Sequence, residues 1–192
     1  MLANRLILTI ALGALASSAF AQEQAVSRDV KQQDRIEAGL QSGALNTREA
    51  SKLEKEESQV SHMEAKAMRN GSVSSAEAQR IDAAQNKVSQ DIYREKHDAQ
   101  RGDPNSASSQ RMQAAVQRNA NQQARIDQGL KSGELTTHEA ARTERGQAHV
   151  DRREARAGSD GHMGARESER VQLAENHQSG RIFRQKHDRQ HN

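Results

Sequence analysis

Two short, identical tripeptides carry the side chains of this chain that are best suited to chemistry. Lys96-His97-Asp98 returns as Lys186-His187-Asp188, 90 residues later in the sequence. Imidazole nitrogens and carboxylate oxygens are natural ligands of divalent metals, and His191 follows His187 at the spacing of one helical turn. The candidate metal ligands are therefore His97, Asp98, His187, Asp188 and His191, with zinc or copper as the ion.

The same tripeptides are also typical of the last turn of a helix. Lysine and protonated histidine complement the negative end of the helix dipole. Each ending offers one histidine and one aspartate beside a lysine, fewer than the three or four protein ligands that a zinc site requires. We expect helix ends at both places and no cofactor, and metal binding remains the alternative.

The rest of the sequence argues against catalysis. The chain has 192 residues, no cysteine and only 2% aromatic residues. It contains no phosphate-cradling glycine loop, no zinc-protease motif and no set of nucleophile, base and acid. Stacking residues for single-stranded nucleic acid are also missing. We therefore expect a protein that is not an enzyme and has no nucleic-acid partner.

A glycine followed six residues later by glutamate occurs four times, starting at Gly43, Gly71, Gly133 and Gly161. The pattern resembles the second half of an EF-hand calcium loop, but the first half lacks the oxygen ligands that calcium needs. Helix capping explains the pattern better. Glycine ends one helix in the left-handed conformation, and Asn46, Ser74 or Thr136 begins the next, with a glutamate three residues on completing a capping box.

The tripeptides belong to a duplication that covers the chain from residue 31 to residue 190. When residues 31–100 are laid on residues 121–190, 29 positions are identical. Two loops divide each copy into three segments with helical periodicity. The sequence predicts an all-α protein of two homologous three-helix units, residues 22–98 and 114–192, joined by a linker at 99–113. The anchors of its core are expected to be Ile92, Tyr93, Ile182 and Phe183.

Residues 1–21 have the features of a cleaved signal peptide. An apolar run from Leu6 to Leu15 follows Arg5, and small residues stand at Ala19 and Ala21. The run is shorter than the roughly 20 residues that span a bilayer, and no later segment approaches that length. We expect cleavage before Gln22, a periplasmic location and no transmembrane segment in the mature chain.

Charge is distributed unevenly over the two units. Residues 22–110 hold 13 basic and 15 acidic side chains, whereas residues 111–192 hold 15 basic and 11 acidic ones. Arginines at 152, 153 and 156 are the clearest local group. Contact with an anionic surface through the second unit is therefore a further alternative.

The segments 42–50 and 132–140, together with the endings 92–98 and 182–188, resemble a group of uncharacterised exported proteobacterial proteins with helical repeats. Leu135-Thr136-x-x-Glu139 is similar to the Leu-Thr-x-x-Gln motif of the Spy and CpxP envelope-stress family, with glutamate in place of glutamine. The resemblance implies a periplasmic helical protein. We expect a non-catalytic binding or structural module, tied to envelope stress, whose partner is an unknown periplasmic protein or a second copy of the chain.

Overall fold

The computed structural model describes the backbone of residues 6–188 and the side chains of residues 21–188. Within this range the chain is all-α, as expected, and contains no strand. The helices are α1 (Leu6–Gln41), α2 (Thr47–Ala67), the short 3₁₀ helix η1 (Met68–Asn70), α3 (Ser75–His97), α4 (Ala107–Ser132), α5 (Thr137–Ala157) and α6 (Ala165–Lys186).

Helix capping sets the boundaries that the sequence predicted. Gly43 and Gly133 adopt φ angles of 71° and 75°, in the left-handed region that side chains with a Cβ avoid. Complete capping boxes open α2, α3 and α5 at Asn46, Ser74 and Thr136. These loops are therefore helix connections, in agreement with the capping interpretation.

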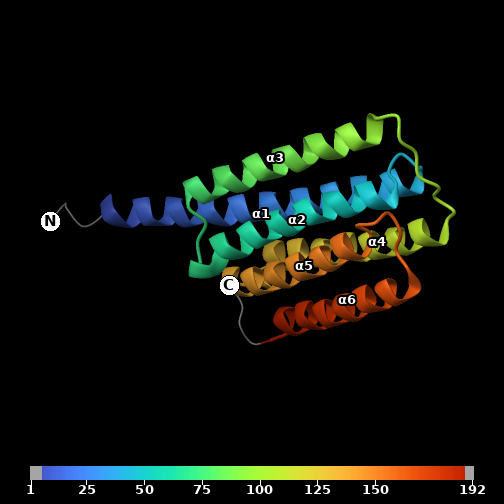
Figure 1. Ribbon diagram of the computed structural model, residues 1–192. Coiled ribbons are helices and arrows are strands. Elements are labelled where there is room, and N and C mark those ends of the chain that lie inside the picture. Colours follow the sequence, from blue (N-terminus) through green and yellow to red (C-terminus); the bar gives the residue numbers. More distant parts are fainter. Residues whose placement is uncertain (1–5, 189–192) are drawn as a thin grey trace.

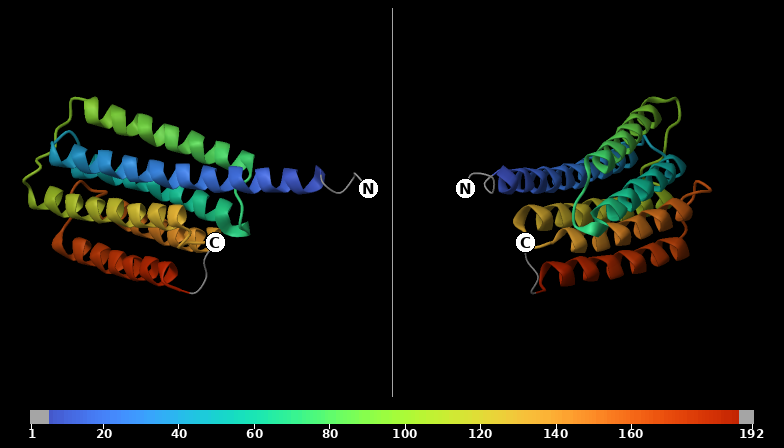
Figure 2. Two further views of the ribbon diagram at one scale, coloured as in Figure 1. Left: turned by 180° about the vertical axis from the view of Figure 1, so that it is seen from behind. Right: turned by 90° about the vertical axis from the view of Figure 1, so that its left-hand side faces the viewer.

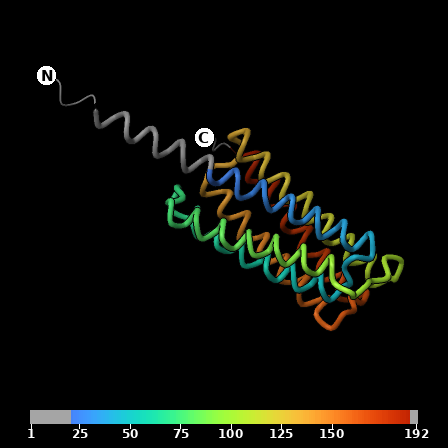
Figure 3. The backbone as a smooth tube through the Cα atoms, turned by 90° about the horizontal axis from the view of Figure 1, so that it is seen from above, coloured from blue at the N-terminus to red at the C-terminus, as the bar shows by residue number. Residues whose placement is uncertain are grey.

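The helices form a bundle with the two units side by side (Figure 1). α2 packs along α5 and α1 along α4, while α3 covers α1 and α2 and α6 covers α4 and α5. The views in Figure 2 show α3 and α6 on opposite outer faces. Seen from above, in Figure 3, the helices share one long axis. The centre of the molecule is thus the surface where the two units meet.

Equivalent positions of the two units touch each other at this surface. The Ser58 hydroxyl donates to the Ala148 carbonyl at 2.8 Å, and the Ser61 hydroxyl donates to Asp151 Oδ2 at 3.2 Å; both pairs are 90 residues apart. Contact between equal positions is the signature of a twofold interface. The duplicated units therefore pair as the subunits of a homodimer would.

Each of the two apolar core clusters draws residues from both units. One cluster includes Ile36 and Leu53 together with Met112 and Met163, and the other cluster is mixed in the same way. The loop between the units is shorter than the predicted linker, since α4 begins at Ala107, with Ser106 as its N-cap. The two units share one core instead of holding one each.

The aromatic side chains are not in this core, which corrects the sequence-based expectation. Ile92 and Ile182 are fully buried, but Tyr93 is 61% exposed and Phe183 is 55% exposed. α3 and α6 are outer helices that pack on one side only, so the isoleucine of each faces the bundle and the aromatic residue, about 100° further round the helix, does not. The smaller isoleucines occupy the core, and the aromatic rings lie at the surface.

Candidate functional site

The histidines predicted as metal ligands bond to their own helices. His97 Nδ1 lies 2.7 Å from the Tyr93 carbonyl oxygen, and His187 Nδ1 lies 2.8 Å from that of Phe183. Each imidazole also stacks on the aromatic ring one turn earlier, with centroids 4.1 and 4.2 Å apart. Both rings thus complete helix ends in the same way.

The two endings do not meet. His97 closes α3 at one end of the bundle, and His187 follows α6 at the other end (Figure 1). Asp188 lies beside His187 at that far end, and His191 lies outside the described residues. The two endings therefore do not contribute ligands to a common site.

Asp98 has acidic neighbours. One oxygen from each of Glu49, Glu95 and Asp98 lies within 4.8 Å of the others. Glu49, however, accepts a hydrogen bond from the Asn46 backbone N–H at 2.9 Å as part of its capping box. Burial and the charges of Asp98 and Glu95 raise the pKa of Glu49. Glu49 therefore belongs to the capping box of α2. The group of three carboxylates is not repeated in the second unit, where Gln185 replaces Glu95.

A larger set of carboxylates lies between the two units, at positions that sequence reasoning missed. Eight acidic residues there are 3% exposed or less, whereas no lysine, arginine or histidine among the described residues is buried to that extent. They are Asp29, Glu54, Glu57, Glu64, Glu144, Asp151, Glu154 and Glu175. The core of this protein is therefore strongly acidic.

Six of these acids form two clusters that the duplication relates. We call the first, which consists of the carboxyl groups of Asp29, Glu64 and Glu144 with the amides of Gln85 and Gln123, the first acidic cluster. Moving each residue by 90 positions gives the second acidic cluster, with three carboxyl groups and two amides again: Asn119, Glu154, Glu54, Glu175 and Gln33. α1 carries a carboxyl group, Asp29, where α4 carries the amide Asn119. Conversely, α3 carries the amide Gln85 where α6 carries a carboxyl group, Glu175.

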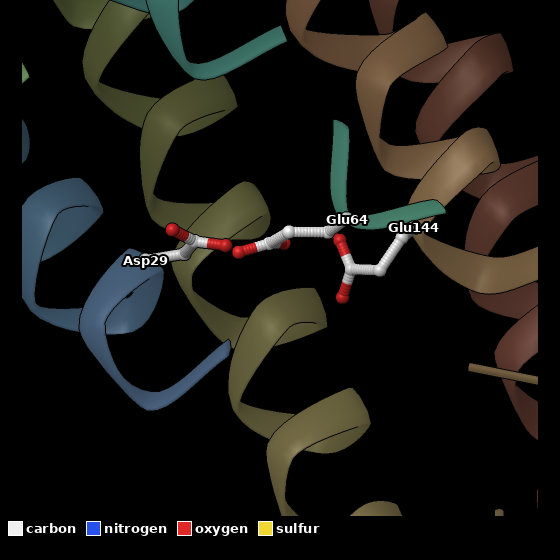
Figure 4. A group of neighbouring side chains, drawn as sticks. All are labelled: Asp29, Glu64 and Glu144. Carbon is white, nitrogen blue, oxygen red and sulfur yellow. The ribbon is translucent and has the colours of Figure 1, made fainter. Parts of the chain in front are cut away.

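In the first acidic cluster the three carboxylates converge from α1, α2 and α5 (Figure 4). One oxygen from each of Asp29, Glu64 and Glu144 lies within 4.8 Å of the others. Gln85 Nε2 donates to Asp29 Oδ1 at 2.6 Å and to Glu64 Oε1 at 3.2 Å. Gln123 Nε2 donates to Glu144 Oε1 at 2.9 Å. The helices α3 and α4 thus supply the amides that position the acids.

Burial dominates the electrostatics of these groups. It raises the pKa of Asp29 from 3.8 to about 6, against the hydrogen bonds from Glu64 and Gln85. Burial and the neighbouring charge of Asp29 also raise the pKa values of Glu64 and Glu144 well above the usual range. A negative charge on any of these carboxylates is therefore costly unless a proton or a cation balances it.

Several oxygens of the first acidic cluster have no hydrogen-bond partner. They are Glu64 Oε2, Glu144 Oε2 and Gln123 Oε1, and each is shielded from solvent. Buried polar atoms are almost always paired in folded proteins, because an unpaired one costs about 1–3 kcal/mol. These atoms are available as acceptors or as ligands.

A surface cavity of about 830 Å³ reaches this cluster from outside. Its lining includes Ala25 and Gln85, and the Gln85 amide that bonds Asp29 also donates to the Ala25 carbonyl at 2.8 Å. Arg28 and Asp82 flank the cavity and form an ion pair at 2.8 Å. Gln85 is thus the member of the first acidic cluster that lines the cavity.

The sequence did contain a signal for these positions. Gln32, Gln33, Glu54 and Glu64 are among the residues kept identical at the 90-residue spacing. Glu64 also lies on the helical face of Leu53 and Val60, where solvent-exposed acids are not expected. The burial of these positions could not be inferred, however, because it depends on α5 of the other unit.

No protein-family model, curated protein or solved structure matches this chain. In the described part of the chain, no helix combines the length and apolarity needed to cross a membrane.

Proposed function

We propose that this chain is a non-catalytic, exported helical protein that binds a divalent cation in its first acidic cluster. The observation that carries the proposal is the convergence of the Asp29, Glu64 and Glu144 carboxylates, with unpartnered oxygens, in a core without buried basic groups. The signal-peptide features of residues 1–21 support export to the periplasm. Cation buffering within the cell envelope fits both observations.

The spacing of the oxygens suits a metal ion. Two oxygens on opposite sides of a calcium ion, with bonds of about 2.3–2.6 Å, are roughly 4.6 to 5.2 Å apart. The three carboxylate oxygens of the first acidic cluster lie within 4.8 Å of one another. Gln123 Oε1, which is buried and unpartnered, adds a neutral oxygen beside them. The cluster thus holds four oxygens of the kind that coordinate a hard cation.

The ligand chemistry selects the class of metal. All candidate ligands are carboxylate or amide oxygens, which prefer hard cations such as magnesium, calcium and manganese. Zinc and copper favour imidazole nitrogen or thiolate sulfur, and the cluster contains no histidine or cysteine. The proposal thus keeps the metal-binding alternative that the sequence raised, but moves it from the exposed histidines to the buried acids.

Charge balance favours the same conclusion. Removing an ion from water into a protein interior costs several kcal/mol even after relaxation, and native proteins are stable by only about 5–15 kcal/mol. Burying three carboxylates without a counter-charge would therefore cost as much as the whole free energy of unfolding. A divalent cation offsets two of the three charges, and the hydrogen bonds from Gln85 and Gln123 spread the remaining one.

Calorimetric titration of the purified protein with Mn²⁺, Ca²⁺, Mg²⁺ and Zn²⁺ at pH 7.5 tests the proposal. We expect one of the hard cations to bind in the micromolar range at one ion per chain and to raise the melting temperature in proportion to saturation. Asp29→Asn should weaken binding at least tenfold. Affinity should also fall as the pH decreases, because protons compete for Asp29, Glu64 and Glu144, whose pKa values are raised by burial.

The duplication supplies a matched control. Asn119 stands at the position of Asp29 in the second unit, and Gln147 at that of Glu57, so both replacements are already tolerated at equivalent places. Glu57→Gln removes a buried acid that is not a candidate ligand and should keep one ion per chain. If none of the four ions binds to the folded wild-type protein, the acids are neutralised by protons alone and the proposal is wrong.

A further inference from the structure

The second unit has a cleft between α5 and α6 that carries a concentrated positive charge. Two adjoining cavities of about 390 and 270 Å³ share the residues His149, Arg153 and Arg170. Arg181 and His177 line the larger cavity, and Arg152 and Arg156 line the smaller one. Glu167, at the end of the smaller cavity, is the only acidic residue in either lining.

The cations of this cleft have few partners of their own. Within the described chain, the side chains of Arg152, Arg156 and Arg170 form no hydrogen bond or ion pair. Arg153 Nε points at His149 Nε2, 3.1 Å away. Burial, followed by the charges of Arg153 and the other arginines, lowers the pKa of His149. Three of the arginines that line the cleft therefore have no paired counter-charge within the described chain.

In the first unit, the equivalent surface between α2 and α3 is neutralised by ion pairs within the protein. There Lys87 contacts Glu56 at 2.8 Å and Asp91 at 2.5 Å, so that acids and bases pair across α2 and α3. At the equivalent positions the second unit has His177, Gly146 and Arg181. Both acids are lost, and one of them is replaced by a base.

Gly146 also creates room. It is a glycine within α5, where glycine costs about 1 kcal/mol relative to alanine. A Cβ atom there would collide with the side chains of Gln178 and Arg181. The replacement of an acid by glycine thus leaves the space beside residue 146 free for the side chains of Gln178 and Arg181.

We propose that the cleft between α5 and α6 is a binding site for a multiply charged phosphate group, with Arg153, Arg170 and Arg181 as its principal ligands. The planar guanidinium fork matches phosphate oxygens in pairs, and several forks around one hollow favour a di- or triphosphate chain over a single small anion. Leu173, 55% exposed at the rim of the larger cavity, adds an apolar contact for whatever carries the phosphate. The site is separate from the acidic clusters and does not depend on the cation proposal.

Calorimetric titration of the full protein with inorganic pyrophosphate, in low salt and with a metal chelator present, tests the site. We expect binding in the micromolar range that weakens steeply as salt increases. The double variant R170Q/R181Q should lose at least tenfold in affinity. The matched control R80Q removes the arginine equivalent to Arg170 from the first unit and should bind as wild type does.

A second double variant, G146E/R181D, transfers the acidic pair of the first unit into the cleft and should abolish binding. Hydrogen exchange of the wild-type protein should show pyrophosphate protection confined to α5 and α6, a readout that does not depend on any variant folding. Vesicles containing phosphatidylglycerol distinguish a lipid headgroup from a soluble phosphate: binding to vesicles that the same variants abolish identifies the lipid source. Absence of binding to both probes, or equal binding by R170Q/R181Q and wild type, would overturn the proposal.

Discussion

At the residue scale, neighbouring positions of one helix have opposite surroundings. Ile92 in α3 is fully buried, whereas Tyr93 stacks on His97 at the surface and is 61% exposed. The second unit repeats the arrangement with Ile182 and Phe183. The larger apolar side chain is thus not the one that stabilises the core.

Substituting Ile92 and Tyr93 one at a time should distinguish the effect of burial on stability from the effect of side-chain size. Ile92→Ala removes fully buried atoms and is expected to lower the free energy of unfolding by about 2–5 kcal/mol. Tyr93→Ala removes a larger but exposed side chain and should cost less than about 1 kcal/mol. Urea denaturation followed by circular dichroism measures both values. A larger loss for Tyr93→Ala than for Ile92→Ala would contradict the buried position of Ile92.

At the scale of elements, one of the four inter-helix loops within the units lacks a side-chain cap. Glu167 accepts a hydrogen bond from the Gly164 backbone N–H at 2.9 Å, which is half of a capping box. Glycine has no hydroxyl to complete the other half, which Ser74 provides at the equivalent place in α3 through a bond from the Glu77 N–H at 3.3 Å. α6 therefore begins with one fewer hydrogen bond than α3.

Gly164→Ser should stabilise the protein. The φ and ψ angles of Gly164 are −73° and 167°, which any residue adopts, so serine adds a cap without strain. The added hydrogen bond and the smaller entropy of the unfolded chain together contribute about 0.5–1 kcal/mol. Thermal denaturation should show a rise of a few degrees. The control Gly164→Ala tests the backbone contribution alone, and an equal rise for alanine would mean that the hydroxyl forms no cap.

At the scale of the whole molecule, the two units meet through acids and amides as well as through apolar side chains. In the second acidic cluster the Asn119 amide donates to Glu154 Oε2 at 2.6 Å, and it also donates to Oδ1 of Asp151, outside the cluster, at 3.2 Å. Arg118 contacts Glu175 at 3.2 Å from the solvent side. Burial raises the pKa values of Glu54 and Glu175 from 4.5 to about 7. The stability of the contact between the two units therefore depends on the protonation of these acids.

Stability should fall as pH rises. Because the folded-state pKa values of Glu54 and Glu175 lie above the unfolded value of 4.5, the folded chain holds more protons than the unfolded chain between about pH 4.5 and 7. Their contribution is most favourable at the acidic end of this window and is lost by about pH 7. Each group accounts for on the order of 3 kcal/mol.

Melting temperatures measured from pH 4.5 to 8 in a metal chelator check this expectation. Glu175→Gln, which copies Gln85 of the first unit, should flatten the profile. A melting temperature that increases steadily with pH would show that the acids are not held protonated in the folded state.

Local structure could be predicted from the sequence alone. The 90-residue repeat, the glycine-to-glutamate spacing and the apolar periodicity predict six helices and their caps, because these depend on hydrogen bonds between residues three or four positions apart. Gly43, Ser74 and Thr136 act as the sequence predicted. The isoleucines at 92 and 182 were also placed correctly in the core.

Which side chains the helices enclose depends on how the two units pack against each other. The face of α2 that carries Glu54, Glu57 and Glu64 is buried because α5 of the other unit lies against it, a contact between residues about 90 positions apart. No local pattern records such a contact. For the same reason the sequence favoured His97 and His187, whose residue types suggest metal binding, over buried acids whose proximity arises only when the two units pair.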